Sequence, residues 1–332
     1  MKMNNELYLN PKLFSDQENI EKVSMIQSFG EGLLAAGDYD KRVVVLSADL
    51  MKSTKVDIFA NEYPERFIEM GIAEQSMASV ASGMAAMGKI PFISSYAIFS
   101  PGRNWEQIRT TICYNNVPVK IIGTHAGILT GLDGGTHQAI EDIALARVIP
   151  RMTVLSPCDA NEAKSMTIQM AQIDGPVYMR IPRGVTPLIT TQETPFEIGK
   201  SEIFFRPDGD ADVGIIASGH LVYNAIRAAK ELDSEGIRVR VLNLSTIKPI
   251  DTDAVVALAR QTGKIVTVED HQIAGGIGSA VAEILATRAP VLMQFVGVRD
   301  VFGQSGHPEE LMIYYNMDIN SIKNVIREIY EK

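Results

Sequence analysis

The stretch MGIAEQSMASVASGMAAMG, residues 70–88, predicts a long helix that carries a single ionisable group, Glu74. Its other side chains are apolar or small, so a neighbouring helix or subunit can approach it closely. A carboxylate in such surroundings is desolvated, which disfavours its charged form and favours proton exchange near neutral pH. The alternative is a buried glutamate satisfied by a backbone donor or a salt bridge. The pattern alone leaves both interpretations open.

Around this helix, helical segments alternate with short apolar segments typical of buried strands. Examples are VVVLSADL (43–50), IPFISSY (90–96) and VKIIGTH (119–125), and a helix is expected over 20–36 with Gly37 as its stop. Such alternation predicts parallel sheets covered by helices on both faces. We therefore expect an α/β protein with two parallel-sheet-rich domains. The expected parts are a polar leader (1–19), a first domain (20–184), a linker (185–200) and a smaller second domain (201–332).

Length and composition limit the classes of function. A chain of 332 residues favours two domains, and its net charge of −9 disfavours a general nucleic-acid or anionic-membrane surface. Only Cys113 and Cys158 are present, far apart, so neither a disulfide framework nor a structural zinc site is indicated. The leader has no apolar signal region, and no apolar run is long enough to cross a bilayer. We expect a soluble, cytoplasmic protein.

Several polar side chains follow directly after expected strands of the first domain. Asp49, Glu74, His125 and Arg183 each stand at such a position. Because ligands of open parallel sheets bind beyond the carboxyl ends of the strands, we expect these side chains to converge there.

A glycine-rich loop, THAGILTGLDGGTHQ (124–138), adds two more candidates, Asp133 and His137. Its glycines let the backbone approach a ligand closely. Two histidines, an aspartate and Arg183 suit a polyhydroxylated anionic substrate, because imidazoles bind hydroxyl or carbonyl oxygens and a guanidinium binds phosphate. The alternative for each histidine is a satisfied structural imidazole.

Six segments, in this order, resemble the C-terminal half of the transketolase family. They are SADL (47–50), MGIAEQ (70–75), THAGILTGLDGGTHQAIEDIA (124–144), YMRIPRG (178–184), VEDH (268–271) and FGQSGHPEEL (302–311). The resemblance extends over nearly the whole chain. It is strongest to split transketolases, in which this half is a separate chain.

This resemblance implies a thiamine diphosphate enzyme, with a pyrimidine-binding domain followed by a transketolase C-terminal-like domain. Glu74 matches the glutamate that hydrogen-bonds N1′ of the aminopyrimidine and promotes its imino tautomer. Asp49 matches an aspartate that contacts the cofactor. Phe99 and Tyr96 fall in the segment whose aromatic side chains stack on the pyrimidine ring.

The same resemblance implies roles toward the substrate. Ser53 and Arg183 match residues that bind the sugar phosphate, and His125, Asp133 and His137 match groups that hold the donor's oxygens and assist proton transfers. One position departs from the family. Where many transketolases place a second phosphate-binding arginine, this chain has Ile26, and an apolar side chain cannot pair with phosphate.

A further departure concerns the metal. The family binds the diphosphate through Mg²⁺ with a GDG motif and a following asparagine, and this pair is missing from the sequence, so no metal ligand is assigned to it. The resemblance therefore implies an obligate partner, an N-terminal transketolase subunit that holds Mg²⁺ and the diphosphate, in an α2β2 assembly.

The expected function is transfer of a two-carbon ketol group between sugar phosphates, by a chain active only with its partner. One alternative is a subunit of another thiamine diphosphate enzyme, such as a deoxyxylulose-phosphate synthase-like protein or the beta subunit of a 2-oxo-acid dehydrogenase. Another is a non-catalytic regulatory partner, against which the presence of Glu74, His125, Asp133 and His137 argues.

Overall fold

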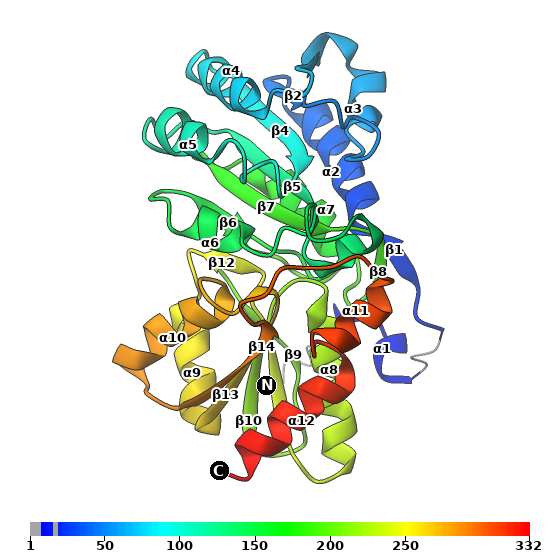
Figure 1. Ribbon diagram of the computed structural model, residues 1–332, viewed down its shortest axis with the longest axis vertical. Helices are drawn as coiled ribbons and strands as arrows, with labels where there is room; N and C mark the ends of the chain where they lie inside the picture. Colours follow the sequence, from blue (N-terminus) through cyan, green and yellow to red (C-terminus); the bar gives the residue numbers. More distant parts are fainter. Residues whose placement is uncertain (1–7, 16–18) are drawn as a thin grey trace.

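The structure is a computed structural model that describes residues 8–15 and 19–332. The rest of the expected leader, residues 1–7 and 16–18, lies outside the described residues. Two sheet domains follow one another along the long axis of the molecule, with the first half of the chain in one and the second half in the other (Figure 1). The expected α/β class with two parallel-sheet-rich domains is confirmed.

The first domain is built on a seven-stranded sheet with the strand order β12-β6-β7-β5-β4-β2-β3. Its strands are β2 (Val43–Ser47), β3 (Phe67–Glu69), β4 (Ile90–Tyr96), β5 (Lys120–Ala126), β6 (Thr153–Leu155), β7 (Val177–Pro182) and β12 (Thr246–Lys248). All neighbouring pairs are parallel except β12 with β6. Every residue of β2 and β5 is buried, as expected where helices cover both faces.

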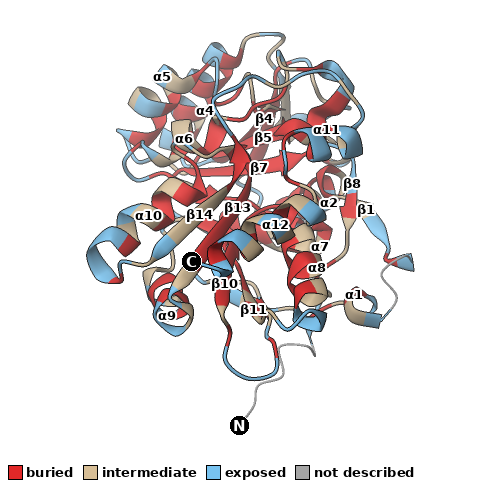
Figure 2. Ribbon diagram, turned by 60° about the horizontal axis from the view of Figure 1, so that its bottom comes forward, coloured by how far each residue is buried: buried red, intermediate tan, exposed pale blue. Residues whose placement is uncertain are grey.

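Helices of the first domain cover this sheet and connect its strands. They are α2 (Met25–Tyr39), α3 (Asp57–Glu62), η3 (Pro64–Arg66), α4 (Glu74–Ala86), α5 (Trp105–Gln107), η4 (Ile108–Cys113), η5 (Ile128–Asp133), α6 (Asp142–Arg147) and α7 (Ala160–Met170). Apart from β3, the strands are almost wholly buried, whereas the helices turn partly exposed faces outward (Figure 2).

The second domain has a five-stranded sheet with the order β14-β13-β10-β11-β9. Its strands are β9 (Glu202–Phe205), β10 (Val213–Ala217), β11 (Val239–Asn243), β13 (Lys264–Gln272) and β14 (Leu292–Val298). Its helices are α8 (Leu221–Ser234), α9 (Thr252–Thr262), α10 (Ile277–Arg288), α11 (Pro308–Tyr314) and α12 (Ile319–Tyr330). Only β9 runs antiparallel to its neighbour in this sheet.

Two details of the helices differ from the sequence expectation. The helix that carries Glu74 begins at that residue rather than at residue 70. Gly37 was expected to end a helix but lies inside α2, which continues to Tyr39. The glycine is needed there for packing, because a Cβ atom on it would lie 2.4 Å from Cε2 of Phe59.

The chain passes between the two domains more than once. The expected linker begins in a strand, β8 (Val185–Pro187), which pairs with β1 (Lys22–Ser24). β12, which follows the second domain's β11, adds to the edge of the first domain's sheet (Figure 1). The described part of the leader includes α1 (Lys12–Ser15), and Leu13 is buried in the apolar core of the second domain.

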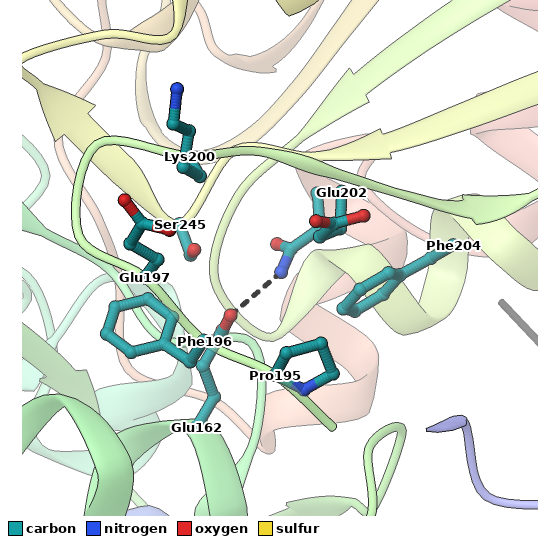
Figure 3. A pocket seen from close by; sticks show the side chains of 9 residues that line it. Glu162, Pro195, Phe196, Glu197, Lys200, Glu202, Phe204 and Ser245 are labelled. Atoms are coloured by element: carbon teal, nitrogen blue, oxygen red, sulfur yellow. Dashed lines mark hydrogen bonds between the residues drawn. The ribbon is translucent and has the colours of Figure 1, made fainter. Parts of the chain in front are cut away.

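A small cavity of about 190 Å³ lies where the linker passes between the domains. Glu162, Phe196 and Lys200 are among its lining residues (Figure 3). The Glu162 carboxylate accepts hydrogen bonds from the Cys158 amide at 2.6 Å and from Asn243 Nδ2 at 3.0 Å. Because these donors come from both domains, Glu162 joins them, and burial raises its pKa to about 7.

In the part of the chain that the structure describes, we find no helix with the length and apolar character needed to span a bilayer.

The Lys120 side chain, at the start of β5, provides a test of the packing of the first domain. Its Nζ donates to the carbonyl oxygens of Ile173 at 2.6 Å and Gly175 at 2.8 Å. Burial lowers the pKa of Lys120 to about 7. The unfolded chain then binds more protons than the folded chain between about pH 7 and about pH 10, so Lys120 makes the free energy of unfolding rise with pH over that range.

We expect Lys120→Met to reduce this rise, because methionine does not titrate. The measurement is urea unfolding of the wild type and the variant at several pH values between 7 and 10. Groups common to both proteins cancel in the difference. Equal pH dependence in the two proteins would contradict a buried Lys120 with a lowered pKa.

Candidate active site

The residues expected from the sequence lie along the carboxyl edge of the first domain's sheet. Asp49 follows β2, Glu74 follows β3, His125 lies near the end of β5 and Arg183 follows β7. These strands are parallel members of one sheet, so their carboxyl ends face the same side.

Glu74 is the first residue of α4 and is 2% exposed. Its Oε2 lies 2.8 Å from Nη1 of Arg103, whose side chain is 47% exposed. The buried carboxylate therefore has a paired cation, which is one of the two alternatives that the sequence left open. Asn104 Nδ2 also donates to the backbone oxygen of Glu74, at 3.2 Å.

Four of the expected residues form one group of rings, which we call the ring cluster: Tyr96, Phe99, His125 and His137. Tyr96 stacks on His125 with 3.9 Å between ring centroids, and on Phe99 with 6.0 Å. His137 meets Phe99 edge to face at 5.6 Å. Arg103 extends the cluster, because its Cζ lies 4.7 Å from the centroid of Phe99. The guanidinium thus lies between the ring cluster and Glu74.

The His125 imidazole is buried and uncharged at neutral pH. Burial is the largest cause of a pKa lowered to about 4, and the nearby charge of Arg183 lowers it further. The residue has a φ of 54°, and Thr130 Oγ1 donates to its backbone oxygen at 2.7 Å. This bond links the end of β5 to the loop that follows it.

Asp133 and Arg183 are brought together as an ion pair. Nη1 of Arg183 lies 2.9 Å from Oδ1 of Asp133 and donates to the carbonyl oxygen of Thr130 at 3.0 Å. Both side chains are partly exposed, at 43% for Arg183 and 34% for Asp133. They are therefore accessible to a ligand that competes for their charges.

Asp49 and Ser53 lie on the exposed segment after β2. The Asp49 amide donates to Oε1 of Glu69 at 2.8 Å, and the Gly71 amide donates to the same atom at 2.9 Å. Over residues 8–15 and 19–332, the structure shows no hydrogen bond or ion pair from the Asp49 or Ser53 side chain to the ring cluster. Ile26 is buried in the core of the first domain, which explains an apolar residue there.

Two residues of the site escaped sequence analysis, Arg103 and Glu69. Arg103 lies 29 residues beyond the glutamate that it pairs with, and no local pattern links the two. Glu69 ends β3, and its carboxylate binds backbone amides of the segments that follow β2 and β3. The only sequence signal for Arg103 was its position four residues after Phe99, on the segment expected to supply stacking rings.

The side chains present suit the aminopyrimidine part of thiamine diphosphate. A buried carboxylate beside stacked aromatic rings matches a flat, nitrogen-containing ring that both stacks and hydrogen-bonds. The diphosphate needs a metal with oxygen ligands. In the described part of the chain, no group of three or more His, Cys, Asp or Glu residues is placed to hold a metal ion.

Comparison with known proteins gives two domain matches. Residues 21–187 match the family described as transketolase, pyrimidine binding domain, and residues 205–322 match transketolase, C-terminal domain. A protein of Methanocaldococcus jannaschii described as a transketolase C-terminal section is 44% identical over 93% of this chain and 96% of its own length. The 6-deoxy-6-sulfo-D-fructose transketolase subunit of Clostridium sp. strain MSTE9 is 40% identical over 90% of this chain and 92% of its own length. An apulose-4-phosphate transketolase subunit of Phocaeicola vulgatus is 35% identical over 92% of this chain and 97% of its own length.

Solved structures agree with these matches. A structure described as a split gene transketolase, inactive beta4 tetramer, superposes with a TM-score of 0.86 at 42% identity, over 93% of this chain and 99% of that one. The transketolase of Campylobacter jejuni, at 22% identity, shares the fold with a TM-score of 0.77, over 96% of this chain and 50% of its own. The chain therefore belongs to the transketolase family and comprises its pyrimidine-binding domain followed by its C-terminal domain.

Proposed function

We propose that this chain is the C-terminal subunit of a two-chain transketolase, which transfers a two-carbon ketol group between sugar phosphates with thiamine diphosphate. The observation that carries the proposal is the meeting of buried Glu74, the ring cluster and the Asp133–Arg183 pair at one sheet edge. Relatives named as subunits of sulfofructose and apulose-phosphate transketolases support the reaction class. They also make pentose phosphates one of several candidate substrate sets.

Glu74 would hydrogen-bond N1′ of the aminopyrimidine, and Phe99 with Tyr96 would stack on that ring, with Asp49 as a further contact. When bound, the cofactor supplies the nucleophilic carbon that side chains lack. N1′ and the Arg103 guanidinium would compete for the Glu74 carboxylate, because Arg103 already occupies its Oε2. A hydrogen bond to N1′ would therefore use Oε1 or displace Arg103 from Oε2.

Groups beside the ring cluster would bind the sugar phosphate. Arg183 and Ser53 would hold the phosphate, and Asp133 would accept hydrogen bonds from sugar hydroxyls. His125 and His137 would position the donor's oxygens and exchange protons with them. His125 is neutral, so it can donate from one ring nitrogen and accept at the other.

A partner chain would complete the site. An N-terminal transketolase subunit would bring Mg²⁺ and the diphosphate-binding residues, in a cytoplasmic α2β2 assembly. The outer face of α4 supports a protein contact there because it carries no charge. Its exposed residues are Gln75, Ser76, Ser79, Val80, Gly83 and Ala86.

The first test is reconstitution of ketol transfer. The chain alone is expected to give no turnover of xylulose 5-phosphate with ribose 5-phosphate, and the chain co-expressed with an N-terminal transketolase subunit from the same organism is expected to be active. In the assembled enzyme, Glu74→Gln should lower kcat by about 100-fold or more, because it removes proton exchange at N1′. Glu62→Gln, an exposed substitution on α3, is the control. Activity of the chain alone, or full activity of Glu74→Gln, would refute the proposal.

A second test concerns the phosphate. Arg183→Met should raise KM for a phosphorylated ketose donor by about 10-fold to 100-fold, because a charge-assisted hydrogen bond is lost. The control substrate is a ketol donor without phosphate, for which KM should change little. An equal increase for both donors would mean that Arg183 acts through Asp133 and not on the phosphate.

The protonation of His125 can be measured in the isolated chain. NMR titration of the histidine ring signals should show His125 with a midpoint near pH 4, and His125→Asn assigns its signal. The imidazole then stays neutral from pH 5 to 8, and any loss of activity in that range has another cause. A midpoint close to the ordinary value of about 6.5 would contradict a buried, neutral imidazole.

A further inference from the structure

The second domain contacts the glycine-rich loop of the first domain directly. We call residues 127–138 the site loop, since it carries Asp133 and His137. At its start, the Ile128 amide donates to both carboxylate oxygens of Asp270, at 2.9 and 3.1 Å. Asp270 lies on β13 of the second domain. A Cβ atom on Gly127 would lie 2.0 Å from Oδ2 of Asp270, so only glycine at that position lets the carboxylate approach.

A second set of contacts holds the middle and end of the site loop. Ser305 Oγ donates to the carbonyl oxygen of Leu132 at 2.6 Å, next to Asp133. Gln138 Nε2 donates to Gln304 O at 2.9 Å and to Gly131 O at 3.2 Å. Residues 304 and 305 follow β14 of the second domain. The site loop is therefore bound to the second domain at both of its ends.

Asp270 is itself part of a buried polar network. Nη2 of Arg180 donates to the Asp270 backbone oxygen at 3.0 Å, and the same guanidinium pairs with Asp142 at 2.9 and 3.2 Å. His220 Nε2 lies 3.4 Å from Oδ2 of Asp270. All four side chains are buried. Breaking such a network leaves charges unpaired in a low-dielectric interior, so its members have little freedom to move.

We propose that the second domain positions the site loop for the reaction, with Asp270 and Ser305 as its positioning residues. Without them, the Ile128 amide would be left unpaired away from water, and the residues around Gly131, where the short helix is kinked, would lose an anchor. The catalytic consequence rests on the proposed function of Asp133 and His137. The mechanical consequence, an ordered site loop, does not.

Hydrogen exchange of the full chain tests the mechanical part. Several site-loop amides are protected by hydrogen bonds within the loop or to its flank, among them Gly127, Gly134 and Gln138. Ser305→Ala should speed exchange over 130–135 by about fivefold, and Asp270→Asn should speed exchange over 127–138 by about tenfold or more. At pH 7.5 Asp270 is ionised, since burial raises its pKa only to about 6.

Ser234→Ala is the matched control, because Ser234 Oγ also donates to a carbonyl oxygen at 2.6 Å from an exposed position, but far along α8. It should leave the site loop unchanged. Exchange of β10 and β13 reports whether the second domain stays folded. Because Ser305 is exposed, its variant remains informative even if Asp270→Asn fails to fold. Unchanged exchange over 130–135 in Ser305→Ala would overturn the proposal.

Kinetics of the assembled enzyme test the catalytic part. Ser305→Ala should lower kcat/KM for the ketose donor by about tenfold, because a misplacement of substrate-binding groups by about 1 Å strongly slows the reaction. The Kd of thiamine diphosphate should stay within about twofold of the wild-type value. Faster exchange with unchanged kcat/KM would also overturn the positioning role. If the assembled wild type shows no ketol transfer at all, the proposed function fails, and the exchange result still decides whether the second domain orders the loop.

Discussion

The arrangement of this molecule depends on one geometric constraint: parallel strands of a single sheet end on the same side. β2, β3, β5 and β7 are parallel members of the seven-stranded sheet, and the segments after them supply the polar side chains of the site. A parallel sheet must be covered on both faces, so its edge at the carboxyl ends is where a ligand can reach the backbone. The candidate site residues therefore lie along one rim of the first domain.

Two buried carboxylates of the first domain, those of Glu74 and Asp142, are each paired with an arginine. Glu74 meets Arg103, and Arg180 meets Asp142. Leaving one of these buried charges unpaired would lower the free energy of unfolding by several kcal/mol, on the order of 3–5. Each arginine therefore stabilises the fold around its carboxylate. The Glu74–Arg103 pair differs from the other because its cation is half exposed. Solvent therefore reaches the Glu74–Arg103 pair, whereas both members of the Arg180–Asp142 pair are buried.

The two domains contribute differently to the candidate site. The first domain carries every side chain of the candidate site, and the second holds the loop that bears two of them. Contacts of this kind, from β13 and from the segment after β14, are the basis of the mechanical role that we propose for the C-terminal domain.

Sequence alone determined the fold class, the family and seven of the residues that meet at the rim: Glu74, Tyr96, Phe99, His125, Asp133, His137 and Arg183. Hydrophobic periodicity and glycine placement are local properties of a sequence, and they indicate the fold class. Motifs keep functional side chains in a fixed order, so the family and its site residues can also be recognised without coordinates. Only the tertiary structure decided that Arg103 neutralises Glu74, that Asp133 pairs with Arg183, and that Asp270 holds the amide of Ile128. These contacts join residues between 29 and 142 positions apart. Pairing over such separations depends on how the sheets and domains pack, which no local sequence pattern encodes.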